Sequence, residues 1–140
     1  MTPWKDRIVT GGAVLIGAMW LFAASLKIAR PIGAIEMTAH LVPATLPSKA
    51  AVAAAVAVET TLGAAMCLRA IRGFLPSLAL LLAFSGFLLV ARAEEEDTLI
   101  PCGCFGDLFG LTIDGALVRN GVLVAVHVAL ILWGRRNPST

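Results

Sequence analysis

The residues best suited to chemistry are two cysteines, Cys102 and Cys104, which are separated by one glycine in the run PCGCFG. Two thiols this close in sequence can form a disulfide only through a small, strained ring. The intervening Gly103 permits the unusual backbone angles that such closure needs. Strain makes a disulfide easier to reduce, which is typical of a bond that forms and breaks repeatedly. The pair therefore favours reversible thiol–disulfide exchange.

Two other interpretations of this pair stay open. Neighbouring cysteines in a loop can remain reduced or form a static bond, and a C-x-C pair can also bind copper or zinc. A structural metal site normally has four ligands, and His40 and His127 lie in other segments of the chain. We therefore assign no metal site. The third cysteine, Cys67, is expected to be a small packed residue.

Four long apolar runs accompany these residues and predict four membrane-spanning helices. The chain of 140 residues is 59% hydrophobic and only 14% charged, with a mean hydropathy of +0.88, whereas a soluble domain carries about a quarter charged residues. Each run approaches the roughly 20 residues that a helix needs to cross a bilayer. The runs cover residues 8–26, 50–68, 74–91 and 115–133. We expect an all-α membrane protein, an antiparallel four-helix bundle that forms one domain over residues 1–140.

The first apolar run has a second interpretation. The first run follows basic residues and ends in the small residues Ala23, Ala24 and Ser25, as a cleaved signal peptide would. Because the run is long enough to span the bilayer, we expect it to be retained.

The net charge of +2 gives no indication of nucleic-acid binding.

Glu59 interrupts the second apolar run. An acid near the middle of a span costs about 3 kcal/mol, so it is expected to face the other helices and to have a partner there. Lys27 or Arg119 could reach it. One interpretation is a group that handles protons or contacts a cofactor, and the other is a buried ion pair that fixes the helix register. Considered alone, Lys27 is typical of a helix-end residue that extends to the membrane surface. His127, in the fourth run, predicts an interhelical hydrogen bond or a contact to a ligand such as a quinone.

The links between the runs differ in character. Residues 32–46 are half apolar and predict a short interfacial helix at the bilayer surface. Residues 92–114 carry the cysteine pair and an acidic stretch at 94–97, which is typical of a solvated helix end. Asp114 is well placed to cap the next helix, because its carboxylate can accept unpaired N–H groups there.

The distribution of Lys and Arg slightly favours one orientation in the cell membrane. With both termini in the cytoplasm, that side holds Lys5, Arg7, Arg69, Arg72, Arg135 and Arg136, and the other side holds Lys27, Arg30, Lys49, Arg92 and Arg119. Basic residues accumulate on the cytoplasmic side, and Arg92 and Arg119 belong to predicted helix ends rather than free loop. We expect the cysteine link to be extracytoplasmic, in an oxidising compartment where a reversible dithiol is chemically sensible.

Five segments spread over nearly the whole chain form a recognisable set: FAASLKI, PIGAIEMTAHLVP, VETTLGAAMCL, PCGCFG and TIDGALVRN. Together they resemble the MauE family of methylamine-utilisation membrane proteins, which is grouped with DoxX-like redox-associated membrane proteins. The most specific feature is CGCFG followed at this spacing by the pair Arg119-Asn120.

The resemblance implies a four-span protein that acts with a periplasmic thioredoxin-like partner. In methylamine utilisation, such a protein is needed to mature the disulfide-rich small subunit of methylamine dehydrogenase. By resemblance, Cys102 and Cys104 would be the redox pair, with Lys27, Glu59, Arg119 and Asn120 supporting it.

These observations lead to two main hypotheses. The first is a membrane thiol–disulfide carrier that exchanges electrons with an extracytoplasmic thioredoxin-like protein and supports disulfide formation in an exported protein, with a quinone as a potential cofactor. The second is a non-catalytic assembly or anchoring subunit of a larger membrane complex. A metal carrier is a third and weaker alternative.

Overall fold

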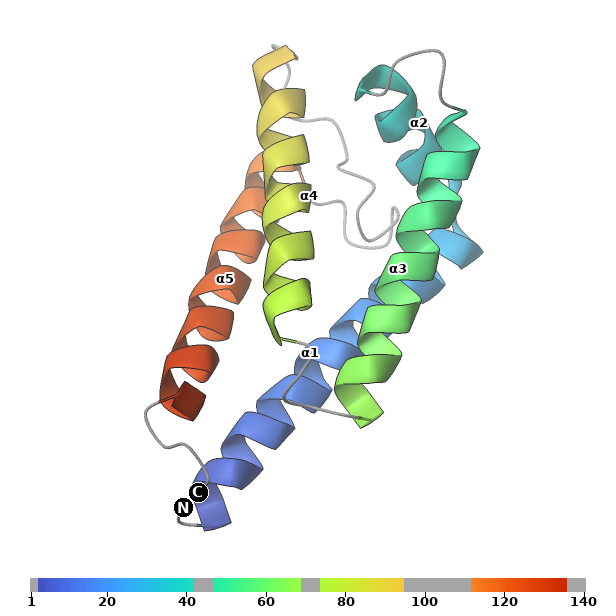
Figure 1. Ribbon diagram of the computed structural model, residues 1–140. Helices are drawn as coiled ribbons and strands as arrows, with labels where there is room; N and C mark the ends of the chain where they lie inside the picture. The colour runs from blue at the N-terminus through green and yellow to red at the C-terminus, as the bar shows by residue number, and fades with distance from the viewer. Residues whose placement is uncertain (1–2, 42–46, 69–73, 95–111, 136–140) are drawn as a thin grey trace.

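The computed structural model describes residues 3–41, 47–68, 74–94 and 112–135, which form five helices (Figure 1). The helices are α1 Pro3–Ala29, α2 Ile32–Leu41, α3 Ser48–Leu68, α4 Phe74–Glu94 and α5 Ile113–Arg135. This confirms the predicted all-α architecture for the part of the chain that the structure describes.

Four of these helices, α1, α3, α4 and α5, are long and apolar enough to cross a membrane. Each begins or ends a few residues beyond the apolar run that predicted it. α1 extends past Lys27 to Ala29, so Lys27 lies on a helix rather than in a link.

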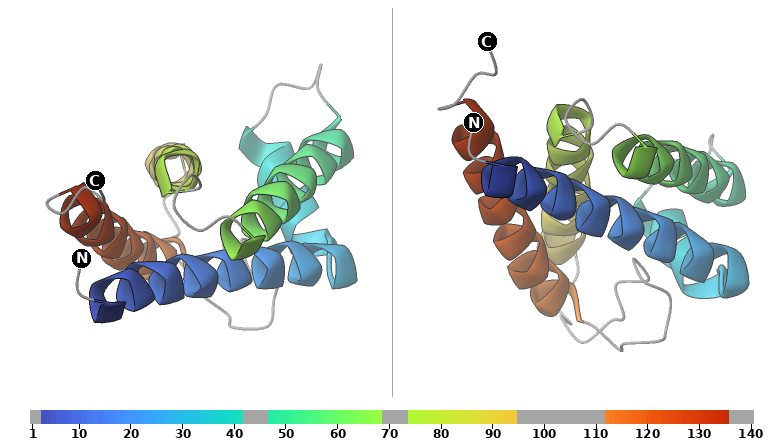
Figure 2. Two further views of the ribbon diagram at one scale, coloured as in Figure 1. Left: turned by 60° about the horizontal axis from the view of Figure 1, so that its bottom comes forward. Right: turned by 90° about the horizontal axis from the view of Figure 1, so that it is seen from below.

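Successive spanning helices alternate in direction, as an antiparallel bundle requires (Figure 1). α1 and α4 run one way, and α3 and α5 run the other. Figure 2 shows that α1 crosses the molecule, with its first half beside α5 and its second half beside α3. Trp4 of α1 meets Trp133 of α5 edge to face, with ring centroids 6.2 Å apart.

The crossing of α1 and α3 depends on two glycines. A Cβ added at Gly17 would lie 2.8 Å from the carbonyl oxygen of Gly63, and a Cβ at Gly63 would lie 2.8 Å from the carbonyl oxygen of Gly17. Small residues of this kind let helix backbones approach closely in lipid, where no hydrophobic force drives helices together. The two helices are therefore in contact at their backbones.

The crossing also explains which side chains meet above it. At 1.5 Å per residue, Lys27 lies about 15 Å along α1 from the crossing, and Glu59 lies about 6 Å along α3 on the same side. Side chains on a helix lean toward its N-terminus. In antiparallel helices, Lys27 therefore leans back toward the crossing while Glu59 leans away from it, and the two charged groups reach the same level.

Two apolar clusters lie on either side of that level. The larger consists of Val9, Ala13, Ile16 and Trp20 of α1, Met66 of α3, and Phe74 and Leu81 of α4. The smaller consists of Met37 of α2, Leu88 and Ala91 of α4, and Ile113 and Ala116 of α5. Along α4 the order is Leu81, Phe84, Leu88, so Phe84 falls between the clusters, at the level where polar side chains gather.

The link before α3 contains the expected short helix, α2, which ends at Leu41. Residues 42–46 of the predicted interfacial segment lie outside the described residues, and a position at the bilayer surface stays a prediction. α2 also contributes to the interior, because Met37 is buried against the ends of α4 and α5.

The predicted cap of the fourth spanning helix is wrong. α5 begins at Ile113, so the capping position falls on Thr112, whose hydroxyl accepts a hydrogen bond from the backbone N–H of Gly115 at 3.3 Å. Asp114 lies inside the first turn and pairs with Arg92 at the end of α4, with 3.0 Å between Nε and Oδ1. This exposed pair joins the two helix ends between which the cysteine link runs.

Candidate functional site

Cys102 and Cys104 lie outside the described residues, in the connection from α4 to α5. Their redox role therefore stays a prediction. The described helices include the end of α4 and the start of α5, between which that connection runs. The candidate site consists of side chains on these helices and their neighbours.

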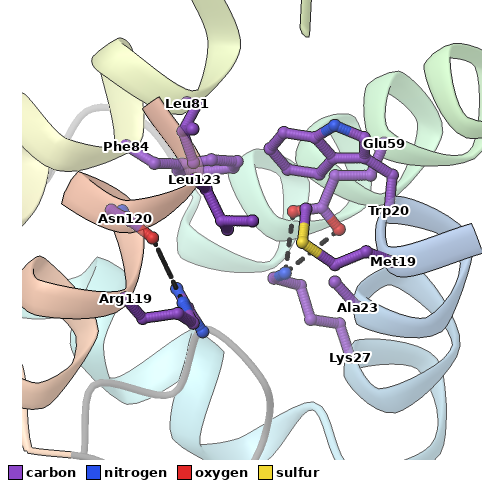
Figure 3. A pocket seen from close by; sticks show the side chains of 10 residues that line it. All are labelled: Met19, Trp20, Ala23, Lys27, Glu59, Leu81, Phe84, Arg119, Asn120 and Leu123. Atoms are coloured by element: carbon purple, nitrogen blue, oxygen red, sulfur yellow. Dashed lines mark hydrogen bonds and ion pairs between the residues drawn. The ribbon is translucent and has the colours of Figure 1, made fainter. Parts of the chain in front are cut away.

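A pocket opens between the spanning helices at the level between the two apolar clusters (Figure 3). All four residues that the family resemblance implies as supporting the cysteines line it, and they come from three different helices. The lining residues are Met19, Trp20, Ala23, Lys27, Glu59, Leu81, Phe84, Arg119, Asn120 and Leu123. Asn120 is seven residues after the start of α5 at Ile113, which places it about 10 Å below that helix end.

The first polar group in the pocket is an ion pair between Lys27 and Glu59. The Lys27 Nζ donates to Oε1 of Glu59 at 2.7 Å and to Oε2 at 3.0 Å. The two side chains are 8% and 1% exposed. Lys27 is thus the partner that Glu59 was expected to have, and the interpretation of Lys27 as a residue extending to the membrane surface is wrong. A proton-handling role for Glu59 stays a prediction.

Lys27 also faces an aromatic ring. Its Nζ lies 5.8 Å from the centroid of Phe84, within the range of a cation–π interaction. Phe84 and Trp20 are themselves neighbours, with ring centroids 6.1 Å apart and an interplanar angle of 35°. The charged group therefore sits at the edge of an aromatic wall.

The second polar group joins α5 to α4. Arg119 donates from Nε and Nη2 to Oδ1 of Asn120, at 3.2 and 2.8 Å. Asn120 Nδ2 donates to the Ser85 hydroxyl at 3.2 Å, and that hydroxyl donates to the carbonyl of Leu81 at 2.8 Å. Arg119 and Lys27 therefore both line the pocket, from α5 and α1 (Figure 3).

A third polar group lies deeper and connects α1, α4 and α5. Trp20 Nε1–H donates to the Ser77 hydroxyl at 2.8 Å, and Ser77 Oγ lies 2.8 Å from Nε2 of His127. His127 Nδ1 lies 2.7 Å from the carbonyl oxygen of Leu123. A carbonyl only accepts, so Nδ1 carries a proton, and in the neutral imidazole Nε2 accepts from the Ser77 hydroxyl.

The hydrogen bond between Ser77 and His127 confirms the interhelical hydrogen bond predicted for His127. Both ring nitrogens are engaged by protein atoms in this arrangement. Sequence reasoning missed Ser77, although a serine in an otherwise apolar run is a signal for such a contact. Ser77 and His127 are fully buried.

The pocket is small in this structure. It has room for about 30 Å³ of water-sized occupants, which corresponds to about two water molecules. Within the described ranges, no three His, Cys, Asp or Glu side chains gather where they could hold a metal ion. Cys67, at the far end of α3, is partly buried, with its Sγ 3.9 Å from the carbonyl oxygen of Val14. The pocket is therefore a small, mostly apolar hollow whose lining includes the buried Lys27–Glu59 pair, Arg119 and Asn120.

The model of a family described as methylamine utilisation protein MauE matches residues 5–134. No curated protein and no solved structure matches the chain. The matched range includes every residue that lines the pocket and both cysteines of the C-G-C pair.

Proposed function

This chain belongs to the MauE family, and we propose that it is a membrane thiol–disulfide carrier whose reacting groups are Cys102 and Cys104. It is a multi-pass membrane protein with four apolar spanning helices. The observation that best supports a carrier is the convergence of Lys27, Glu59 and Arg119 on one pocket. Three ionisable side chains at membrane depth are costly, and such groups mark functional sites in membrane proteins.

The proposed chemistry is thiol–disulfide exchange. A thiolate of a reduced partner attacks one sulfur of the Cys102–Cys104 disulfide, the S–S bond breaks, and the other cysteine leaves as a thiolate. The partner's second thiolate then attacks the mixed disulfide. The partner leaves oxidised and the C-G-C pair is left as a dithiol, so two electrons have moved from partner to carrier. The reverse sequence uses the same mixed disulfide.

The proposed partner is an extracytoplasmic thioredoxin-like protein. This partner would pass oxidising equivalents to an exported protein with several disulfides, such as the small subunit of methylamine dehydrogenase in the family's namesake system. The orientation follows from the basic-residue distribution, which favours cytoplasmic termini. The Thr112 cap and the Arg92–Asp114 pair fix the two helix ends that present the cysteine link.

Trapping of the mixed disulfide tests this function. In Cys104→Ser or Cys102→Ser, the remaining thiolate can attack the disulfide of the oxidised partner, as in the reverse sequence, and no second carrier thiolate is present to break the mixed disulfide. The partner should therefore accumulate covalently bound on a non-reducing gel. Cys67→Ser is the matched control. Cys67 lies at the C-terminal end of α3, and its replacement should leave trapping unchanged. If neither variant traps a protein and the double serine variant still supports maturation, the anchoring-subunit hypothesis replaces the carrier.

Labelling in cells tests the orientation. In a Cys67→Ser chain, a membrane-impermeant thiol reagent added to the outside should modify Cys102 and Cys104 after reduction. Labelling only in inverted vesicles would place the link on the cytoplasmic side and remove an extracytoplasmic partner.

A further inference from the structure

Arg119 donates two hydrogen bonds to Asn120, whose side-chain amide is neutral. We propose that Ser85 is a positioning residue of the carrier, because it fixes the orientation of that amide and so holds the Arg119 guanidinium group in one place. The inference rests on the proposed function for the role of Arg119 in thiol–disulfide exchange. The positioning itself is argued from side chains on α4 and α5.

The orientation of the Asn120 amide is dictated from both of its sides. A guanidinium group only donates, so the amide oxygen must face Arg119, and Oδ1 accepts from Nε at 3.2 Å and from Nη2 at 2.8 Å (Figure 3). The Ser85 hydroxyl gives its one proton to the carbonyl oxygen of Leu81 at 2.8 Å, so its oxygen is left to accept. Asn120 Nδ2 donates to that oxygen at 3.2 Å. Both neighbours therefore favour the same orientation.

Ser85 differs in this respect from other hydroxyls of the spanning helices. Ser25, Thr60 and Thr61 each donate to a backbone carbonyl oxygen of their own helix, three or four residues earlier. Ser85 makes the same local bond and also accepts one from the neighbouring helix. Because the local bond uses the hydroxyl proton, it also sets the direction of the contact with Asn120.

Packing of α4 against α5 does not require this contact. The two helices already meet through Leu88, Ala91, Ile113 and Ala116, each at most 1% exposed. Asn120 is 2% exposed, and a buried amide is tolerated only when its polar groups are paired. An apolar residue would join the helices without that requirement. What the amide adds is a fixed position for the guanidinium group.

Loss of the Ser85 hydroxyl would release the amide. Asn120 Nδ2 would lose its acceptor, and rotation of the amide by half a turn would bring its NH2 group against the guanidinium group, donor against donor. Asn120 lies about 10 Å along α5 from Ile113, at a depth where water is scarce as a substitute. Arg119 would then lose the amide oxygen that holds it.

A fixed cation serves the proposed chemistry. Each step of thiol–disulfide exchange begins from a thiolate, and a positive charge favours the thiolate over the thiol. The charge of Lys27 is already balanced by Glu59, whereas the two bonds from Arg119 to a neutral amide leave its charge intact. The role of Arg119 in the carrier is then to favour the thiolate form of the cysteine pair, and the role of Ser85 is to keep Arg119 in position.

Rates of mixed-disulfide formation test this role. The parent chain carries Cys67→Ser and whichever of Cys104→Ser and Cys102→Ser traps the oxidised partner faster. Near neutral pH, Arg119→Gln should slow trapping about tenfold and Ser85→Ala about three- to tenfold, because the first removes the charge and the second removes its support. Both deficits should shrink at alkaline pH, where the thiol ionises without help. Ser85→Thr keeps a hydroxyl and should trap at close to the parent rate.

Combined variants separate positioning from a general loss of packing. Ser85→Ala should cause no further slowing in a chain that already carries Arg119→Gln, because the group that Ser85 positions is absent. Ser77→Ala is the matched control, since it removes a hydroxyl from the same helix, but one that is bonded to Trp20 and His127. Any slowing caused by Ser77→Ala should persist with Arg119→Gln and at alkaline pH.

Nuclear magnetic resonance tests the positioning without thiol chemistry. In isotope-labelled protein carrying Cys102→Ser and Cys104→Ser, the Nε–H proton of Arg119 should exchange slowly with water, because it is bonded to Asn120. Its signal is assigned by its absence in Arg119→Gln. Ser85→Ala should speed that exchange about three- to tenfold, and Ser77→Ala should leave it unchanged.

The outcomes separate this inference from the proposed function. Unchanged exchange in Ser85→Ala, or slowing by Ser85→Ala that is equally large with and without Arg119, overturns the positioning role, while trapping by the parent chain still supports the carrier. Faster exchange in Ser85→Ala, together with no mixed disulfide in any chain, shows that Ser85 positions Arg119 but that the carrier function is wrong.

Discussion

The Nζ atom of Lys27 lies 2.7 Å from Oε1 of Glu59, so that two residues 32 positions apart form a buried ion pair between α1 and α3. Buried pairs of this kind contribute little net stability relative to well-packed apolar residues, but loss of one partner leaves a charge with no compensation. If either residue is replaced alone, the charge of the other stays buried without a counter-charge.

We predict that Lys27→Met alone and Glu59→Leu alone each lower the free energy of unfolding by about 3–5 kcal/mol. The double variant should be far less destabilised than the sum of the two, because neither charge is then stranded. Reversible unfolding in mixed detergent micelles measures all four corners of this double-mutant cycle. Additive losses would show that the two side chains do not depend on one another.

The glycine crossing makes a second prediction. Gly17→Ala should destabilise the fold by about 1–3 kcal/mol, because the new Cβ would lie 2.8 Å from the Gly63 carbonyl oxygen and 2.9 Å from the Cys67 sulfur. Gly11→Ala is the matched control in the same helix, since a Cβ there has nothing within 4 Å. Thermal unfolding in detergent should separate the two variants, and equal melting temperatures would contradict a tight crossing.

The spans were predictable from the sequence because bilayer thickness dictates their length and lipid dictates their composition. The partner of Glu59 was not, because Lys27 and Arg119 both lay within plausible reach. The choice between them depends on where α1 crosses α3, and that crossing is a tertiary contact between Gly17 and Gly63. The periodicity of either helix alone carries no information about it.

Ser77 and Asp114 illustrate two other limits. A serine in a membrane helix often bonds to its own backbone, as Ser85 does with Leu81, so a serine in an apolar run does not by itself distinguish an interhelical contact at Ser77 from a local one. Asp114 is a strong capping residue, but a shift of the helix start by two residues from the predicted run moved the cap to Thr112. A sequence indicates that a helix forms more clearly than it indicates at which residues the helix begins and ends.

The buried hydrogen-bond chain gives a third prediction. Ser77→Ala should cost about 1–3 kcal/mol, because it leaves the Trp20 N–H and the His127 Nε2 atom without the hydroxyl between them. Ser25→Ala should change stability by less than about 0.5 kcal/mol, since Ser25 is exposed and bonds only within its own helix. In a chain with Trp4→Phe and Trp133→Phe, a shift of the Trp20 emission maximum reports the loss directly, and an unshifted spectrum would contradict the contact.

The ends of the cysteine link provide the final prediction. Thr112→Ala should lower stability by about 1 kcal/mol, because the N–H of Gly115 loses its capping hydroxyl. Asp114→Asn should cost less than about 1 kcal/mol, because its pair with Arg92 is about half exposed and solvent screens it. If Asp114 were the cap, the order of the two losses would reverse. Hydrogen exchange of the first-turn amides of α5 distinguishes the two, since only loss of the true cap should speed exchange at Gly115.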